Sequence, residues 1–397
     1  MEKYFACYID SELREKSSSG GIYPAIADYV LNQSGIVYAS VYNEDFSVSF
    51  RRIDNKTEIT KTYGSKYVQS SLGDTFKNIK KDLECKSTVL FCGTHCQVAG
   101  LKAYLDKERI DYSNLYTIDL FCHGVPSNKV WQKYLAQKKD GKQLKSVNMR
   151  SKKSGWSYYS FSFEYLIDDK KEYILNNDDT YMKGFIRNLY LRPSCYSCKF
   201  KGNLSSADIT LGDFWGVDRV LPNMDDNKGT SSMIIRTDKG TELLNALEKR
   251  ADLVIEETDY NSMISYNNGL IAIPNKHDSR RRFFNKLDST DDIFILINSC
   301  LSVSPLLKFK NRLKNILCKV LKIQKENKNC NKNNFVKGKI YDKSENCSGC
   351  TACQSICPKN AISMREDVEG FFYPDINSEK CIKCKKCLSV CPIKCKI

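Results

Sequence analysis

The fold of the C-terminal part is decided by the stretch CSGCTACQSICP (residues 347–358) and by a second copy of its spacing, CIKCKKCLSVCP (residues 381–392). Each copy has three cysteines separated by two residues, a fourth cysteine after three more residues, and a proline directly behind it. Three thiols this close can bind one face of the same bound group, whereas the fourth, held by the proline, points away from them. The doubled pattern therefore predicts two sites that exchange their fourth cysteine.

This spacing is the ligand run of bacterial ferredoxins with two 4Fe–4S clusters. The predicted ligands of the first cluster are Cys347, Cys350, Cys353 and Cys391. The predicted ligands of the second are Cys381, Cys384, Cys387 and Cys357. Zinc and disulfides are the alternatives, but zinc sites rarely repeat as a doubled set of three cysteines plus one. The pattern therefore indicates a chain that transfers electrons.

Length and composition narrow the class of protein. The chain has 397 residues, enough for two or three domains, and its hydrophobic content of 41% is ordinary for a soluble globular protein. No apolar stretch approaches the roughly 18 residues of a membrane span, and the N-terminal sequence has no apolar segment of a signal peptide. Nineteen cysteines in ligand spacings require reduced thiols, so we expect a cytoplasmic protein.

The formal net charge is +15. Because an oxidised 4Fe–4S cluster with four thiolates carries −2, three clusters would reduce the net charge to about +9. The remaining positive charge favours an acidic partner. It does not indicate nucleic-acid binding, because no recognition motif accompanies it.

Residues 1–300 have the pattern of one large α/β unit. The apolar runs 87–91 and 115–121 are typical of buried strands that end in glycine-containing loops. Apolar residues at helical spacing follow both runs, at 98–105 and 129–135. Strands that alternate with helices predict a parallel sheet.

Residues 301–338 predict a basic amphipathic helix followed by an Asn- and Lys-rich linker. The helix could lie on an anionic membrane surface, or pack on the main domain with its basic face in solvent. The second interpretation is favoured because Phe309 is the only aromatic anchor of the apolar stripe. Residues 339–397 then form a small α+β ferredoxin-like domain.

Four cysteines outside the doubled pattern also have the features of ligands. Cys96 lies in FCGTHCQVAG, Cys122 in DLFCHGVPS, and Cys195 and Cys198 form a C-x2-C in LRPSCYSCKFKG. Loops at the ends of parallel strands meet at one edge of a sheet, so these thiols can form a third cluster site. Zinc and a redox-active dithiol are the alternatives, and Cys92 could replace Cys96 as a ligand.

A glycine-bearing loop, Ser17–Gly21, precedes a predicted helix at 22–31. Such a loop can offer backbone N–H groups and the positive end of the helix dipole to a phosphate, although Ser-Gly is also an ordinary capped turn. No GxGxxG or Walker pattern is present in the sequence. A domain of this size nevertheless suggests an organic cofactor or substrate beside the clusters.

Six segments carry a family resemblance in this order: SSSGG, GSKYVQS, CGTHCQVAGLKAYL, DLFCHGVPS, LRPSCYSCKFKG and ADITLGDFWG. Together they resemble the coenzyme F420 hydrogenase/dehydrogenase beta-subunit family over roughly residues 1–270. The similarity is greatest to bacterial members found with polysaccharide-biosynthesis genes. A ferredoxin module is a common companion in that family.

The resemblance implies an α/β flavin-binding domain that binds FAD, with a cluster close by that is held by Cys96, Cys122, Cys195 and Cys198. The residues that match the FAD-contact loops are Ser18, Ser19, Gly20, Lys66, Ser70 and Thr94. His123, beside a cluster ligand, would relay protons, or it is a loop histidine that shapes its turn.

The chain departs from the family pattern twice. The family usually places the ferredoxin module before the flavin domain, whereas here it follows, and the family usually has proline where Thr94-His95 stands. The deazaflavin F420 is also not indicated by any residue of the sequence, because resemblance does not fix the substrate.

These observations predict an iron–sulfur flavoprotein oxidoreductase, in which FAD links two-electron chemistry to one-electron clusters. Its partner would be a redox protein or a small-molecule electron donor. The alternative is a non-catalytic relay subunit that docks on a partner enzyme through its basic face. A zinc-stabilised nucleic-acid-binding protein is a third interpretation, against which the doubled ferredoxin spacing argues.

Overall fold

The structure is a computed structural model that describes residues 2–157, 160–302 and 340–394. The predicted basic helix and linker at 301–338 lie outside the described residues, except for residues 301 and 302. No helix in the described ranges is long and apolar enough to cross a membrane.

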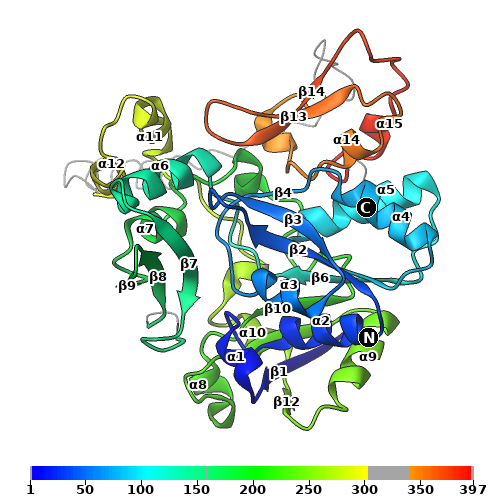
Figure 1. Ribbon diagram of the computed structural model, residues 1–397, viewed down its shortest axis with the longest axis vertical. Coiled ribbons are helices and arrows are strands. Elements are labelled where there is room, and N and C mark those ends of the chain that lie inside the picture. The colour runs from blue at the N-terminus through cyan, green and yellow to red at the C-terminus, as the bar shows by residue number, and fades with distance from the viewer. Residues whose placement is uncertain (1, 158–159, 303–339, 395–397) are drawn as a thin grey trace, which may run out of the picture.

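A nine-stranded sheet forms the centre of the molecule, with the strand order β12-β1-β11-β10-β6-β5-β2-β3-β4 (Figure 1). The strands, in that order, are Leu253–Glu257, Lys3–Ile9, Ser231–Ile235, Ile209–Asp213, Leu115–Leu120, Val89–Cys92, Ile36–Tyr42, Val48–Ile53 and Ser70–Ser71. The four central strands β10, β6, β5 and β2 are parallel, and antiparallel strands extend the sheet on both sides. The predicted parallel α/β sheet is therefore present, with the two apolar runs as β5 and β6.

Alternating side chains of this sheet face two layers of helices. In β2, Val37 and Ala39 belong to the core under one layer, whereas Ile36 and Tyr38 belong to the core under the other. The first layer contains α2 (Ile22–Asn32) and α9 (Asp238–Leu247), and the second contains α4 (Thr75–Glu84) and α5 (His95–Glu108). Because helices cover both faces of the sheet, its central strands appear in the sequence as continuous apolar stretches.

Short helices complete this unit. They are α1 (Glu12–Glu15), α3 (Lys56–Ile59), α8 (Val217–Val220) and α10 (Tyr260–Ile264), together with the 3-10 turns η1 (Thr60–Thr62), η2 (Pro193–Ser197), η3 (Pro222–Met224) and η4 (Asn268–Leu270). Residues of α8 and α10 cover the β1 and β11 part of the sheet with a core of their own. The turn η2 contains the predicted C-x2-C ligand Cys195.

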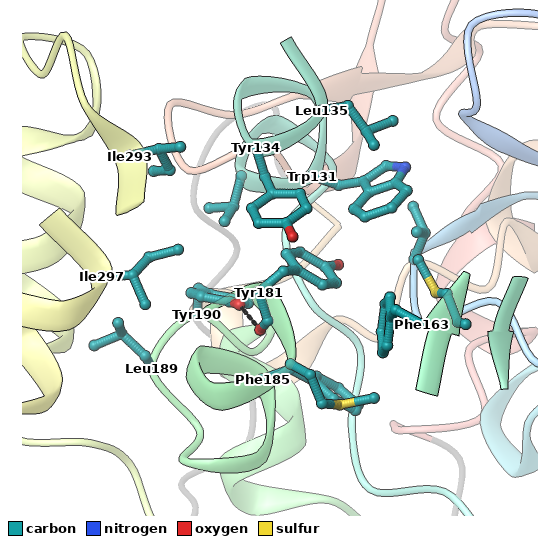
Figure 2. Close-up of a cluster of buried hydrophobic side chains, with 14 of the residues drawn as sticks. Trp131, Tyr134, Leu135, Phe163, Tyr181, Phe185, Leu189, Tyr190, Ile293 and Ile297 are labelled. Carbon is teal, nitrogen blue, oxygen red and sulfur yellow. Dashed lines mark hydrogen bonds between the residues drawn. The ribbon is translucent and has the colours of Figure 1, made fainter. Parts of the chain in front are cut away.

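A second, antiparallel sheet lies within residues 144–175 and was not predicted. Its strands are β7 (Leu144–Ser151), β8 (Ser162–Ile167) and β9 (Lys170–Leu175). It packs with the helices α6 (Asn128–Lys139), α7 (Thr180–Ile186), α11 (Arg280–Leu287) and α12 (Ile293–Leu301). The core between them is mainly aromatic, with Trp131, Tyr134, Tyr181 and Tyr190 close together (Figure 2).

The ferredoxin-like part begins with η5 (Ser344–Asn346) and places the hairpin β13 (Ile362–Glu366) and β14 (Phe372–Ile376) between two short helices, α14 (Ala352–Ser355) and α15 (Lys386–Ser389). Both helices begin after a residue in the left-handed conformation, Thr351 and Lys385, each with a φ of 61°. These residues occupy equivalent positions in the two sequence copies, so the repeat in sequence is also a repeat in structure. In Figure 1 this part lies against α4 and α5.

Candidate metal and cofactor site

The eight cysteines of the doubled pattern line two cavities in the ferredoxin-like part. The first cavity is lined by Cys347, Cys350, Cys353 and Cys391, with apolar walls that include Ile340, Ala352 and Ile393. The second is lined by Cys357, Cys381, Cys384 and Cys387, with walls that include Ile362, Ile376 and Ile382. In each cavity three thiols come from one copy and the fourth from the other copy, as the spacing predicts.

The environment of these thiols suits a group that binds thiolates. Burial raises the pKa of Cys350 to about 12, and the neighbouring Cys391 and Cys347 act in the same direction. Burial also raises the pKa of Cys347 and Cys353. Buried thiols such as these three keep their protons unless a metal group takes the place of the protons. A backbone N–H of Ala361 also donates to Cys357 Sγ at 3.3 Å, and such N–H···S contacts are one of the protein's means of tuning iron–sulfur groups.

No group of three or more His, Cys, Asp or Glu side chains in the described ranges is arranged to hold a single metal ion. A 4Fe–4S cluster makes a different demand, because it binds four thiolates through four separate iron atoms. The lack of a single-ion site in those ranges is therefore compatible with cluster sites at these cysteines.

The other four predicted ligands also come together. Cys96 lies in the first turn of α5, Cys122 lies behind β6, and Cys195 and Cys198 lie in and directly after η2. Burial raises the pKa of Cys96 to about 12, and Cys122 and Cys198 are close enough to raise it further. Cys195 has Cys96, Cys122 and Cys198 as neighbours, and each of them acts to raise its pKa.

Cys92, the possible substitute for Cys96, lies apart from this set. Its charged neighbours are Asp119 and Lys66, and none of the four cysteines is among the groups that shift its pKa. Its burial raises its pKa to about 12. The geometry thus favours Cys96 as the fourth member of the set.

The three cysteine sets follow one another through the molecule. The helix α5 carries Cys96 in its first turn, and a Cβ atom added at Gly100 would lie 3.0 Å from Cys350 Sγ. The Cys96 thiol is one of the groups that raise the pKa of Cys350, after burial as the main cause. Cys353 in turn has Cys387 of the last set among its electrostatic neighbours. The order is therefore the Cys96 set, the Cys347 set and the Cys381 set.

Specific contacts hold the ferredoxin-like part on the main part. Arg280 of α11 forms an ion pair with Glu369, with distances of 2.8 and 2.5 Å from its two terminal nitrogens to the carboxylate oxygens. Ser127 donates to the carbonyl of Glu369, and Lys129 donates to the carbonyl of Val368 at 3.1 Å. These contacts fix the turn between β13 and β14 on the start of α6.

The Ser17–Gly21 loop differs from the expectation. A glycine-bearing loop can offer free N–H groups, but the N–H of Gly20 donates to Ser231 Oγ at 2.9 Å and is therefore engaged within the protein. FAD contact at this loop stays a prediction. A Cβ atom at Gly20 would lie 2.3 Å from the carbonyl oxygen of Cys7, so glycine is needed here because the loop lies directly on β1.

The serines of the loop are also engaged. Ser18 Oγ accepts from the backbone N–H of Ser65 at 2.6 Å, and Ser19 Oγ donates to the carbonyl of Thr230 at 3.0 Å. The carbonyl of Ser18 accepts from Arg150 and from the indole of Trp156, each at 3.1 Å. The loop is therefore held rigidly among the ends of several elements, with Arg150 itself paired to Asp213 at 2.7 Å.

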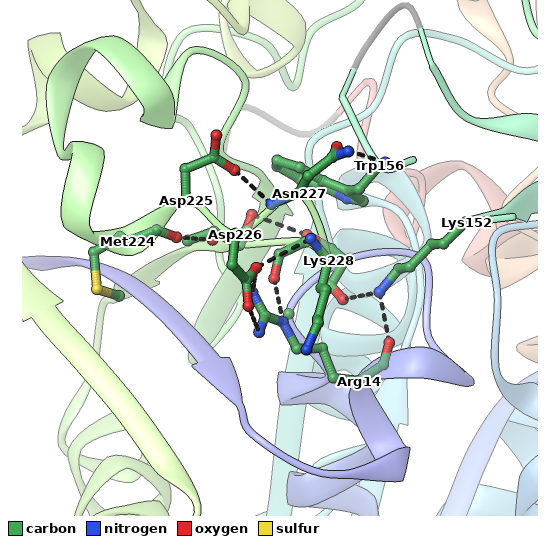
Figure 3. Close-up of polar contacts among 12 residues, drawn as sticks. Arg14, Lys152, Trp156, Met224, Asp225, Asp226, Asn227 and Lys228 are labelled. Atoms are coloured by element: carbon green, nitrogen blue, oxygen red, sulfur yellow. Dashed lines mark hydrogen bonds and ion pairs between the residues drawn. The ribbon is translucent and has the colours of Figure 1, made fainter. Parts of the chain in front are cut away.

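Two lysines beside this loop have no ion-pair partner in the part of the chain that the structure describes. Lys66 donates to the carbonyls of Thr62, Tyr63 and Gly64 at 3.1 Å each, and burial lowers its pKa to about 7. Lys152 donates to the carbonyls of Arg14 and Ser19 (Figure 3). Burial and then the charges of Arg14 and Arg150 lower its pKa to about 7.

Lys152 was missed by the sequence reasoning. It lies in the run RSKKSGW (150–156), which reads as an ordinary basic turn without a motif. Lys152 contacts the carbonyl of Arg14, and most strands of the main sheet lie between these two residues in the sequence. Arg14 itself forms an ion pair with Asp226 at 2.6 Å. Only the fold shows that this lysine lies at the Ser17–Gly21 loop.

The remaining predicted contacts lie around the strand ends. Thr94 caps α5 through a capping box with Gln97, and its hydroxyl lies 3.3 Å from Cys96 Sγ. Ser70 is in the short edge strand β4. His123 packs edge-on against Phe185 with 4.9 Å between ring centroids, and burial lowers its pKa. The structure therefore places Thr94 and His123 beside the Cys96 set.

An α/β unit with one set of four cysteines, followed by a ferredoxin-like part with two more sets, defines the chain as an iron–sulfur protein of the electron-transfer class. Comparison with family models identifies the family. The beta subunit of coenzyme F420 hydrogenase/dehydrogenase is described by an N-terminal model, which matches residues 4–77, and a C-terminal model, which matches residues 86–261. Residues 346–395 match the model of a 4Fe-4S dicluster domain. The chain belongs to the coenzyme F420 hydrogenase/dehydrogenase beta-subunit family and carries a 4Fe–4S dicluster domain behind it, as predicted.

The chain is also similar to a curated protein and to a solved structure. A curated relative, the coenzyme F420-dependent sulfite reductase of Methanocaldococcus jannaschii, is 25% identical over 265 residues. The match covers 65% of this chain and 39% of that protein, so the chain spans about two fifths of its relative's length. A solved structure, the F420-reducing NiFe hydrogenase complex from Methanosarcina barkeri, is 20% identical with a TM-score of 0.45, covering 64% of this chain and 81% of the matched chain.

Proposed function

We propose that this iron–sulfur oxidoreductase holds three 4Fe–4S clusters and binds FAD at the Ser17–Gly21 loop, and so joins a two-electron donor or acceptor to one-electron carriers. The observation that supports it most is the continuous order of the three cysteine sets from α5 to the last helix. A bound FAD would supply the change from two-electron to one-electron chemistry, and the clusters would carry single electrons.

The chain's own residues would perform three tasks. The twelve cysteines would bind the clusters, with the crossed fourth ligands Cys357 and Cys391 tying the two ferredoxin sites together. Lys66 and Lys152 would supply positive charge to an anionic cofactor, since both lie at the loop without a carboxylate partner within ion-pair distance among the described residues. His123 would hold or pass a proton beside the Cys96 set, and because burial lowers its pKa, a proton that it accepts is readily passed on.

The FAD proposal keeps the contact residues given by the family resemblance. They are Ser18, Ser19, Gly20, Lys66, Ser70 and Thr94. The family name instead points to the deazaflavin F420, which is a two-electron carrier and a candidate for the donor. We expect a cytoplasmic protein whose partner is a redox protein or a small molecule.

A second candidate is a relay subunit without a flavin. It is favoured by one observation: the chain matches only 39% of the length of a curated relative, so it corresponds to one portion of a larger enzyme there. Such a subunit would dock on a partner enzyme, and its positive charge would favour an acidic surface.

Anaerobic purification followed by iron, sulfide and flavin analysis tests both candidates. Three clusters require about twelve iron and twelve sulfide per chain. FAD released on denaturation, together with bleaching by NADH, NADPH, reduced ferredoxin or reduced F420, would support the flavoprotein. Protein with all its clusters that neither contains nor takes up FAD would refute it and leave the relay subunit.

A further inference from the structure

We propose that Arg192 is a built-in positive charge that raises the reduction potential of the cluster held by the Cys347 set and, less strongly, that of the Cys96 set. This inference rests on the proposed function, because it requires clusters at these cysteines. It assigns a role to a residue outside the ligand motifs.

Arg192 connects the two parts of the molecule. It precedes η2, three residues before Cys195, and is 1% exposed. Its Nε donates to the carbonyl of Cys347 at 2.9 Å, and a terminal nitrogen lies 3.7 Å from Cys347 Sγ. The same nitrogen donates to the carbonyl of Phe372 at 2.8 Å. The guanidinium of the main part is therefore anchored on a cluster ligand of the ferredoxin-like part.

Arg192 differs from the other buried arginines in lacking a carboxylate. The described residues include four buried arginines, and three of them pair with an acid: Arg14 with Asp226, Arg150 with Asp213 and Arg280 with Glu369. No carboxylate oxygen among the described residues lies within ion-pair distance of Arg192, whose other polar contact is the neutral Gln69 at 3.4 Å. A buried charge without a counter-charge is strongly destabilising, so the position requires an anion.

The nearest groups that can be negative are the cysteines. Burial raises the pKa of Cys347 and Cys96, and the charge of Arg192 opposes that effect at both. The aromatic ring of Tyr373 lies over the guanidinium at 4.3 Å, so water is displaced from this side. A 4Fe–4S cluster with four thiolates would supply the missing negative charge.

The effect on the potential follows from Coulomb's law. Reduction adds one electron to a cluster, and a fixed positive charge in a poorly solvated site stabilises the added negative charge. The hydrogen bond toward the cysteine sulfur acts in the same direction, since net charge and hydrogen bonds to sulfur set cluster potentials. Removing the charge should therefore make the cluster harder to reduce.

The test is a redox titration of the holoprotein with dithionite and mediators, followed by electron paramagnetic resonance. In Arg192→Gln we expect the equilibrium constant for one-electron reduction of the Cys347-set cluster to fall at least about tenfold, a shift of about 59 mV to lower potential. Arg192→Lys keeps a positive charge but loses the fork of hydrogen bonds, so it should restore part of the potential that Arg192→Gln loses. The signal is assigned by its loss in Cys350→Ala.

Two further variants separate charge from structure. Arg280→Gln removes another arginine that joins the two parts, but one whose charge faces Glu369, and it should leave the potential within about threefold of wild type. Gln69→Glu keeps Arg192 and places a carboxylate beside it, so it should lower the potential in the same direction as Arg192→Gln. Gln69→Glu decides the question if Arg192→Gln fails to retain the cluster.

The outcomes are distinct. A wild-type potential in Gln69→Glu, or equal shifts in Arg192→Gln and Arg280→Gln, would overturn the role of Arg192 while the clusters remain. A shift in Arg192→Lys as large as in Arg192→Gln would overturn it as well. Wild-type protein without a cluster at the Cys347 set, seen in the iron analysis before any titration, would instead refute the proposed function.

Discussion

At the scale of single residues, the assignment of the third cluster depends on whether Cys92, at the end of β5, or Cys96, in the first turn of α5, is a ligand. Cys96→Ala should reduce the iron content by about four of about twelve atoms per chain, because it removes one ligand of one cluster. Cys92→Ala is the matched control, since Cys92 is four residues away and has Asp119 and Lys66 as neighbours. Iron analysis of both anaerobic proteins is the measurement. Loss of iron in Cys92→Ala with full iron in Cys96→Ala would reverse the assignment.

The two lysines at the Ser17–Gly21 loop predict a pH dependence of FAD binding. Both have a pKa of about 7, so they are charged below and largely neutral above this pH. A phosphate binds the charged form better, and the affinity should therefore fall by about tenfold or more between about pH 6 and about pH 8.5. Fluorescence titration of flavin-depleted protein measures it.

The lysine variants give the control for this prediction. Lys66→Met and Lys152→Met should each weaken binding at low pH and flatten its pH dependence, because each removes one titrating charge. Lys171→Met removes an exposed lysine of β9 and should leave the profile unchanged. A wild-type profile that is flat, or that is flattened by Lys171→Met as much as by the other two, would contradict the assignment.

Residues that belong to a recognisable motif could be predicted from the sequence even where their partners are distant, whereas residues without a motif could not. The repeated cysteine spacing predicts which thiols share a cavity, including the fourth thiol that comes from the other copy. Lys152 and Arg192 have contacts more than 100 residues away along the chain and no motif. Gly20 was identified as a candidate cofactor contact from the family resemblance, whereas its close packing on Cys7 is visible only in the fold.

At the scale of elements, the crossed ligands make a prediction about the two halves of the ferredoxin-like part. Cys357→Ala should damage the cluster of the second half, because Cys357 lines the cavity of Cys381, Cys384 and Cys387. The spectroscopic signal lost in this variant should be the one lost in Cys384→Ala. Loss of the signal that disappears in Cys350→Ala would contradict the crossing, and the exposed Cys85→Ala should change neither signal.

The elements themselves were predicted where burial produces a simple pattern. Strands β5 and β6 are covered on both faces, so they appear as apolar runs at nearly the expected residues. Strand β9, KKEYIL, is exposed over most of its length and has no such pattern. The sheet β7–β8–β9 was therefore missed, although it builds the aromatic core with α6 and α7.

At the scale of the whole molecule, the order of the domains could be predicted from the sequence, but the contact between them could not. The dicluster domain follows the large domain in the sequence, and the family matches have the same order. The contact depends on Arg280 and Arg192, which meet Glu369 and Cys347 only in the folded chain. Three cysteine sets could thus be predicted, but their arrangement in one row required the fold.

The net charge gives a prediction for the partner. The charge of +15, or about +9 with three clusters, should attract an acidic redox partner most strongly at low salt, where the Debye length is long. The second-order rate of electron transfer with an acidic ferredoxin should therefore fall by about tenfold between about 20 mM and about 300 mM NaCl. Stopped-flow absorbance at the cluster bands measures the rate.

An uncharged small-molecule reductant provides the control, and its rate should change by less than about twofold over the same range because it has no charge to attract. A relay subunit meets its partner through a charged surface, so its physiological donor must show the steep salt dependence. If the rates with the acidic ferredoxin and the uncharged reductant responded equally to salt, the positive charge would have no role in partner binding. The docking surface would then have to be sought among the uncharged residues.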